Sequence, residues 1–143
     1  MPDHNTPLVF ITGASGGIGQ ALAAQYAQAG WRLALSARRT GELETWIQAN
    51  GLGPEQAQVY GADVAQADSI IAAGQACIER QGLPDTVIAN AGISIGMDTT
   101  ERGDLDVMAQ IFAINNLGLA ATFHPFVAAM RTRGSGRLVG IAS

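Results

Sequence analysis

The sequence predicts an α/β fold in which helices cover both faces of a parallel, doubly wound sheet. Two observations support this prediction. Short apolar runs alternate along the chain with longer segments of helical periodicity, and a cluster of glycines joins the first apolar run to the first helical segment. With 143 residues, 48% hydrophobic and 14% charged, the chain suits a single globular domain over residues 1–143.

The first half of the chain alternates between strand and helix. Leu8–Ile11 is an apolar strand, and the helix after it shows an apolar face at Ile18, Leu22 and Tyr26 before it ends at Gly30. We then expect a strand over residues 31–39, a helix over 40–50 that Gly51 stops, and a strand over 57–64. The order of these elements is β-α-β-α-β.

The second half continues the same alternation. We expect a helix over residues 66–81, a strand over 85–92, helices over 101–115 and 119–131, and a strand over 136–143. The strand at 85–92 is apolar on both faces, as a parallel strand covered by helices should be. In the helix over 101–115, we expect four apolar side chains to face inward: Leu105, Met108, Ile111 and Phe112.

The glycine cluster TGASGGIG runs from Thr12 to Gly19 and has two interpretations. It could be a flexible turn, or it could bind a phosphate, because glycine lets the backbone approach a pyrophosphate at a helix N-terminus. The cluster follows the first strand and opens the first helix, which favours a dinucleotide site. Gln20 follows Gly19 and the chain has no lysine, so a nucleoside-triphosphate P-loop is disfavoured.

The end of the second strand indicates which dinucleotide binds. An acidic residue there commonly binds the ribose 2′-hydroxyl of NAD, whereas a basic residue accommodates the 2′-phosphate of NADP. Here the strand ends in Arg38 and Arg39, and guanidinium groups pair with phosphate in a bidentate manner. We therefore expect NADP(H) to be preferred, with Arg38 the better ligand and NAD(H) still possible. The alternative is that both arginines are solvated charge at the start of a helix.

Composition excludes several other functions. The net charge of −4 and the lack of a basic stripe disfavour nucleic-acid binding. Cys77 is the single cysteine and has helical spacing with apolar neighbours, so we expect a buried core residue and a cytoplasmic protein. No leader or membrane-spanning apolar run is apparent, so no membrane partner is expected. His4 and His124 are unlikely to pair, so we expect no metal site.

Five ordered motifs resemble the short-chain dehydrogenases/reductases, a family with a Rossmann-type fold. Thr12–Gly19 is similar to the family's TGxxxGxG motif, Asp63-Val64 to its third-strand pair, and Asn90-Ala91-Gly92 to its NNAG segment, with Ala89 replacing the first asparagine. Asn115 with Gly118 is similar to N-x-x-G, and residues 136–143 to the strand that carries the catalytic serine.

This resemblance implies roles for individual residues. Gly13, Gly17 and Gly19 would shape the phosphate site, and Ser15 and Ile18 would contact the phosphates. Asp63 and Val64 would hold the adenine, and Asn90, Ala91 and Gly92 would line the nicotinamide side. Ser143 would bind the substrate carbonyl, and Asn115 would position a water for proton transfer. Taken alone, Asp63 and Asn90–Gly92 could equally be turn residues, and Asn115 could be a buried amide that joins neighbouring elements.

The family's proton donor is a tyrosine in a Y-x-x-x-K segment, and this chain lacks one: Gly30 and Val64 stand four residues after Tyr26 and Tyr60. We therefore expect an oxidoreductase acting on an alcohol or carbonyl, represented by a chain that lacks the C-terminal part of the fold and is inactive by itself. The resemblance also implies a dimer or tetramer in the complete protein. Without its remaining part, four apolar residues are expected to lose cover: Leu119, Phe123, Phe126 and Val127.

Two other functions stay possible from the sequence. A non-catalytic dinucleotide-binding module would share every motif up to the missing tyrosine. A SAM-dependent methyltransferase is built on a similar sheet, although Asn90-Ala91-Gly92 and the serine strand argue against it.

Overall fold

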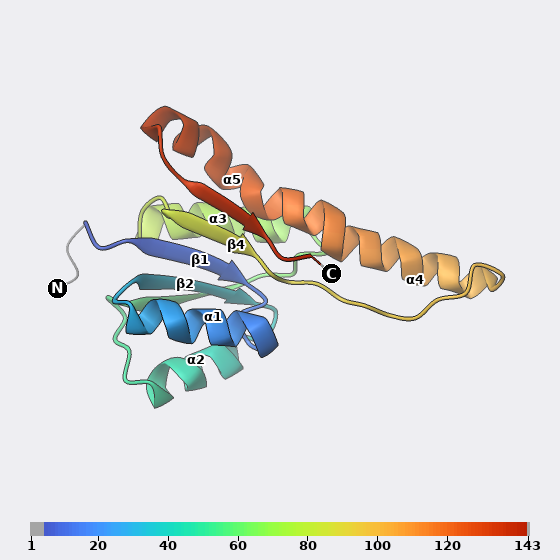
Figure 1. Cartoon of the computed structure of the whole chain (residues 1–143), viewed down its shortest axis with the longest axis horizontal. Coiled ribbons are helices and arrows are strands. Elements are labelled where there is room, and N and C mark those ends of the chain that lie inside the picture. Colours follow the sequence, from blue (N-terminus) through green and yellow to red (C-terminus); the bar gives the residue numbers. More distant parts are fainter. Residues whose placement is uncertain (1–4, 143) are drawn as a thin grey trace.

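The computed structural model describes residues 5–142 and contains one five-stranded parallel sheet with strand order β3-β2-β1-β4-β5 (Figure 1). The strands are β1 (Leu8–Thr12), β2 (Arg32–Ala37), β3 (Ala57–Gly61), β4 (Thr86–Ala89) and β5 (Arg137–Gly140). The helices are α1 (Gly17–Gln28), α2 (Thr40–Ala49), α3 (Ala67–Arg80), α4 (Arg102–Phe112) and α5 (Gly118–Arg133), with a π-helical turn η1 (Ala113–Leu117) between the last two. The predicted α/β, Rossmann-type fold with a doubly wound parallel sheet is confirmed.

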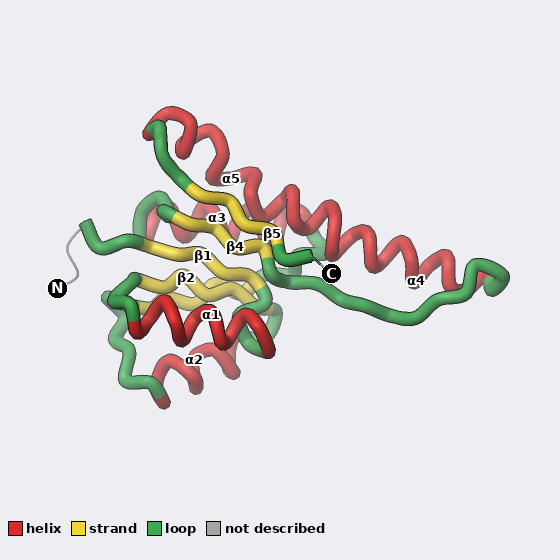
Figure 2. The backbone as a smooth tube through the Cα atoms, viewed as in Figure 1, coloured by secondary structure: helices red, strands yellow, loops and turns green. Residues whose placement is uncertain are grey.

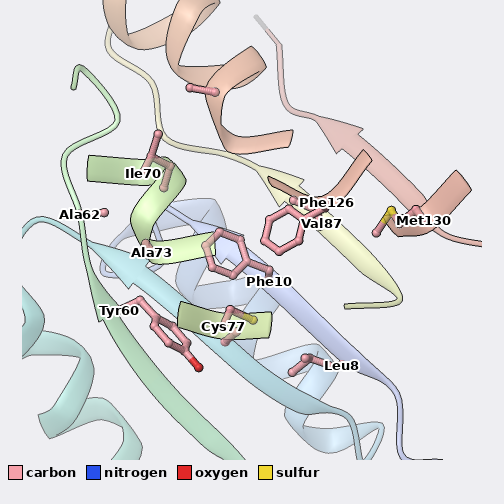
Figure 3. Packing of buried hydrophobic residues seen from close by; sticks show 12 residues of the cluster. Leu8, Phe10, Tyr60, Ala62, Ile70, Ala73, Cys77, Val87, Phe126 and Met130 are labelled. Carbon is pink, nitrogen blue, oxygen red and sulfur yellow. The ribbon is translucent and has the colours of Figure 1, made fainter. Parts of the chain in front are cut away.

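Alternate residues of β1 supply the two halves of the core, as a strand covered on both faces requires. Leu8 and Phe10 point to the side of α3 and α5, where the ring of Phe10 lies 5.2 Å from that of Phe126 (Figure 3). Val9 and Ile11 point to the other side, where α1 and α2 pack. All four β1 residues are fully buried, so the sheet is a rigid platform for whatever lies at its edges.

The second strand is shorter than the sequence predicts, and the difference affects the site. Ala37 pairs with Gly61, the last residue of β3, so no partner strand extends beyond this point. Arg38 and Arg39 therefore leave the sheet instead of continuing the strand to residue 39. They form the connection to α2, on the side where all five parallel strands end.

The helix over residues 101–115 is exposed, contrary to prediction. No residue of α4 is buried, and the exposed fractions of Leu105 and Phe112 are 44% and 53%. The helix continues through η1 into α5 and, with the extended segment that leads back to β4, projects away from the sheet (Figure 2). The prediction of an inward stripe was wrong for Leu105 and Phe112, while Met108 and Ile111 are half-buried. Helical periodicity identifies an apolar face but not whether the described chain provides a surface to cover it.

The packing of α5 also differs from the prediction that its apolar face loses cover. Of the four residues expected to lose cover, Phe126 is fully buried between the sheet and α3, whereas Leu119, Phe123 and Val127 are half-buried. Gly74 makes this close approach possible, since a Cβ there would collide with Pro125. The outer edge strand β5 is less covered, and Leu138 keeps 40% of its surface exposed.

By length and composition alone, the helical run Arg102–Arg133 could cross a membrane, although the sequence analysis expected no such segment. In this fold its second half packs against α3 and β4. The cytoplasmic location stays a prediction.

Candidate functional site

A cavity of about 380 Å³ lies at the carboxyl edge of the sheet, where the strand order reverses between β1 and β4. Open parallel sheets bind ligands at this topological switch point, because the connections after the two central strands leave on opposite sides. The walls come from turns that follow four strands. They include Gly13 and Ser15 after β1, Arg38 after β2, Asp63 after β3 and Gly92 after β4.

Glycines after β1 form one wall of the cavity. At two of these positions the neighbouring backbone is too close for any larger residue. Gly13 has a φ of +61°, and a Cβ there would lie 3.0 Å from the Cα of Ala91. At Gly19 a Cβ would collide with the carbonyl oxygen of Gly13, so α1 can lie this close to β1 only with glycine. Gly16 and Gly17 instead face open space, and Gly17 has a φ of +47°. The N-terminus of α1 is thus held against the sheet while its outer face stays free for an anion.

Thr12, the last residue of β1, connects the end of this strand to the turn that follows β4. Its buried hydroxyl oxygen accepts hydrogen bonds from the backbone N–H groups of Asn90 at 3.0 Å and Ala91 at 3.1 Å. The Asn90 amide in turn donates to the Gly13 carbonyl oxygen at 3.2 Å. Asn90 therefore positions the glycine turn and does not line the cavity itself. Ala89, which replaces an asparagine of the family motif, is buried within β4.

The turn after β2 carries the charges that the sequence singled out. Arg38 and Arg39 both line the cavity, together with Ser36 and Glu42. Within residues 5–142, the Arg38 side chain makes no hydrogen bond or ion pair, whereas the Arg39 guanidinium lies 3.9 Å from the Glu42 carboxylate. The two arginines thus present different electrostatic environments, and Arg38 is the one whose charge is uncompensated.

The turn after β3 is fixed by its own hydrogen bonds. The backbone N–H of Asp63 donates to the Ser69 hydroxyl at 3.0 Å, and the Asp63 carboxylate accepts from the N–H of Ala65 at 2.9 Å. Val64 contacts the start of α5, where a Cβ on Gly118 would lie 2.7 Å from the Val64 carbonyl oxygen. Gly118 therefore lets the long helix approach this wall. Asp63 is both a turn residue and part of the cavity lining.

Asn115 lies in the π-helical turn η1, a feature often found at functional sites. Its amide nitrogen donates to the carbonyl oxygen of Ile93 at 2.7 Å, and its amide oxygen accepts from the Ile93 N–H at 2.8 Å. The side chain thus fixes the segment after β4, which forms the far wall of the cavity. The proton-relay role implied by the family resemblance stays a prediction.

The structure brings most of the predicted cofactor residues to one cavity. Those that line it are Gly13, Ser15, Arg38, Arg39, Asp63, Val64, Ala91 and Gly92. Gly17, Ile18 and Gly19 lie at the start of α1 without lining the cavity, and Ile18 is exposed. Ser143 and His4 lie outside the described residues.

Several lining residues were not identified as site residues from the sequence: Thr12, Gly16, Ser36, Glu42, Ile93 and Ile114. Thr12 and Gly16 carried a signal, since both lie in the TGASGGIG cluster, and Glu42 offered one as an acid three residues after Arg39 at the start of a helix.

The titratable groups with strongly raised pKa values lie in the core and not at the cavity. Burial raises the pKa of the Cys77 thiol to about 12, and burial also raises the pKa of Tyr60, whose hydroxyl donates to Gln81. Cys77 is fully buried, which confirms that it is a core residue. In residues 5–142 no group of three or more His, Cys, Asp or Glu side chains could hold a metal ion.

Comparisons with known proteins agree with this geometry. A family model described as short chain dehydrogenase matches residues 7–143. A dehydrogenase/reductase SDR family protein 7-like from Anopheles gambiae is 33% identical over 144 residues, which cover 97% of this chain and 45% of that protein. The chain spans about half the length of the curated relatives it matches first.

Solved structures show the same arrangement. Actinorhodin polyketide ketoreductase with NADPH matches with a TM-score of 0.89 and 30% identity, over 100% of this chain and 55% of that chain. The alcohol dehydrogenase from the archaeon Thermococcus sibiricus, complexed with 5-hydroxy-NADP, matches with a TM-score of 0.83 and 31% identity, over 94% of this chain and 57% of that chain. The motifs, the strand order and these matches lead to one conclusion: the chain belongs to the short-chain dehydrogenase family of oxidoreductases.

Proposed function

We propose that this chain is the cofactor-binding part of an NADP(H)-preferring oxidoreductase that transfers hydride between nicotinamide and an alcohol or carbonyl. The observation that carries the proposal is the uncompensated guanidinium of Arg38 in the cavity at the switch point. Two matched structures whose descriptions include NADPH or an NADP derivative support the same cofactor class. An acidic residue at the end of this strand would have favoured NAD(H) instead.

The described residues fit such a dinucleotide. Gly13, Gly16 and the first N–H groups of α1 would hold the pyrophosphate, because Gly16 and Gly17 face open space and the helix N-terminus attracts anions. Arg38 would hold the 2′-phosphate, Asp63 and Val64 would flank the adenine, and Ala91 with Gly92 would flank the nicotinamide side. A bound nicotinamide dinucleotide supplies or accepts the hydride.

The protein side of the reaction needs a proton donor beside the reacting oxygen. Residues 1–143 contain no Y-x-x-x-K segment, so we propose that this chain by itself binds cofactor without turnover, and that Ser143 and Asn115 contribute to a site completed elsewhere in the protein. We also propose a homo-oligomer for the complete protein, because the exposed apolar side chains of Leu105, Phe112 and Leu117 are of the kind that subunit interfaces cover.

The cofactor assignment is tested by replacing Arg38 with Asp and measuring the dissociation constants of NADPH and NADH by fluorescence titration. Loss of a charge-assisted phosphate contact should weaken NADPH binding by about 10- to 100-fold. NADH binding should be unchanged or slightly stronger, because its 2′-hydroxyl carries no charge. Arg131→Asp is the matched control, since it makes the same charge change on the exposed last turn of α5.

If Arg38→Asp and Arg131→Asp give the same ratio of NADH to NADPH affinity, Arg38 does not bind the 2′-phosphate. If the unaltered protein binds neither dinucleotide, the proposed function is wrong. A non-catalytic dinucleotide-binding module is the second candidate, because it would share every motif of residues 1–143. It predicts tight NADPH binding without carbonyl reduction by the full-length protein.

A further inference from the structure

Glu42 is a charged residue of the cavity to which neither the sequence motifs nor the proposed function gives a role. It lies in the first turn of α2, and it lines the cavity beside Ser36, Arg38 and Arg39. Helical side chains point toward the N-terminus of their helix. The first turn of α2 follows the carboxyl end of β2, so the Glu42 carboxylate extends toward the carboxyl edge of the sheet and over the cavity rather than away from it.

Glu42 lines the same cavity as both arginines, and among residues 5–142 its carboxylate is paired only with Arg39. It lies 3.9 Å from the Arg39 guanidinium, and the two side chains are 57% and 82% exposed. An ion pair with this separation and this exposure to water is weak, so Arg39 neutralises little of the negative charge of Glu42. An acidic residue in the first turn of a helix also interacts favourably with the helix dipole, so Glu42 stabilises α2. This stabilisation does not account for a carboxylate that shares a cavity with a predicted phosphate ligand.

The charges at this end of the cavity oppose one another. Arg38 attracts a ribose 2′-phosphate, which carries nearly two negative charges at neutral pH, and Glu42 repels it. Across a few ångströms of water-exposed space, each such interaction changes affinity by several fold. The 2′-hydroxyl of NAD(H) is uncharged and is almost indifferent to both side chains. The Glu42 carboxylate therefore changes the affinity for NADP(H) relative to NAD(H), because the two cofactors differ only at the ribose 2′ position.

We propose that Glu42 is a specificity-determining residue that limits the preference for NADP(H) over NAD(H) by weakening NADP(H) binding. This inference rests on the proposed function, because it presumes that a nicotinamide dinucleotide occupies the cavity. Removing the Glu42 charge should sharpen discrimination, in contrast to removing the Arg38 charge, which should abolish it.

The test measures dissociation constants of NADPH and NADH for four forms of the protein: unaltered, Glu42→Gln, Glu42→Asp and Glu44→Gln. Glu42→Gln should tighten NADPH binding about three- to tenfold and change NADH binding less than about twofold. Glu42→Asp keeps the charge and should retain the original ratio. Glu44→Gln removes the same charge from the same helix at an exposed position outside this cavity, and should leave both constants unchanged.

Salt provides a readout that a purely structural role would not move. The gain from Glu42→Gln should shrink between about 20 mM and 300 mM salt, because the interaction is screened. If Glu42→Gln and Glu44→Gln give the same NADH to NADPH ratio, or if the gain is independent of salt, the inference is wrong while the proposed function stands. If the unaltered protein binds neither dinucleotide, the proposed function fails and the inference fails with it.

Discussion

The sharpest structural test is Gly19→Ala, which adds one methyl group where α1 approaches β1. The new Cβ would collide with the Gly13 carbonyl oxygen and lie 2.7 Å from the amide nitrogen of Asn90. The first of these atoms is backbone, so rotating a side chain does not relieve the contact. The N-terminus of α1 must move by about 1 Å before a normal contact distance is restored.

This displacement should affect stability and binding together. Overpacking a buried site costs typically 1–3 kcal/mol, and a rigid backbone contact places Gly19→Ala near 3 kcal/mol. For a domain of this size, that corresponds to a fall of roughly 10 °C in melting temperature. NADPH and NADH should both lose affinity by at least about tenfold, because the helix N-terminus no longer faces the pyrophosphate at the same distance.

Gly41→Ala is the matched control, since a Cβ at Gly41 meets no atom within 4 Å and the residue lies in the first turn of α2. It should be neutral or stabilise the protein by up to about 1 kcal/mol. Thermal unfolding followed by circular dichroism and titration with both dinucleotides give the two readouts. Equal melting temperatures and equal affinities for Gly19→Ala and Gly41→Ala would refute the argument that this glycine sets the position of α1.

Three further predictions follow from buried or paired groups. Thr12→Val keeps the shape of the side chain but leaves two backbone N–H groups of the turn after β4 without their acceptor. The free energy of unfolding, measured by urea denaturation, should therefore fall by about 2–4 kcal/mol. The control Thr132→Val, on the exposed end of α5, should change it little. Asn115→Ala removes both hydrogen bonds to Ile93, so hydrogen exchange at the Ile93 N–H should accelerate about tenfold or more; unchanged protection would contradict the assigned contact. Burial raises the pKa of the Cys77 thiol from an ordinary value of 9 to about 12, so as the pH rises the thiol loses its proton first in the unfolded chain. The free energy of unfolding should therefore fall between pH 9 and 12, by on the order of 1 kcal/mol per pH unit. Cys77→Ala should reduce this slope.

The sequence predicted the fold well because its signals are local and repeated. Apolar runs such as Leu8–Ile11 identify buried strands, and glycines such as Gly30 and Gly51, both with positive φ, mark where helices end. Chemistry-bearing residues then fall at the carboxyl ends of successive strands. Parallel pairing brings those ends to one edge, so Gly13 and Arg38 could be placed in one site from the sequence, whereas Asp63 was assigned to it only through the family resemblance.

The errors have other physical causes. Phe112 and Leu105 were placed inward because periodicity identifies an apolar face, but burial depends on a surface that local sequence does not specify. The Thr12 hydroxyl binds backbone N–H groups 78 and 79 residues away, and such contacts leave no periodic trace in the sequence. Glu42 was missed because an acid in a first helical turn is already explained by the helix dipole. Only the structure shows that its carboxylate also lines the cavity.

Affinity and specificity have separate structural origins in this cavity. The turns after β1, β3 and β4 are each held by a contact within the protein: the Ala14 N–H donates to the Ser36 carbonyl oxygen, Asp63 closes its own turn, and Thr12 fixes the turn after β4. These walls exist before ligand binding, so binding requires little ordering of the backbone. The side chain of Arg38, by contrast, makes no hydrogen bond or ion pair with any other residue of 5–142 and must be ordered by its ligand. Changes in the fixed turns should therefore weaken both dinucleotides alike, whereas changes at Arg38 and Glu42 should alter their ratio. A variant of Thr12 that shifted the NADPH to NADH ratio as strongly as Arg38→Asp would contradict this separation.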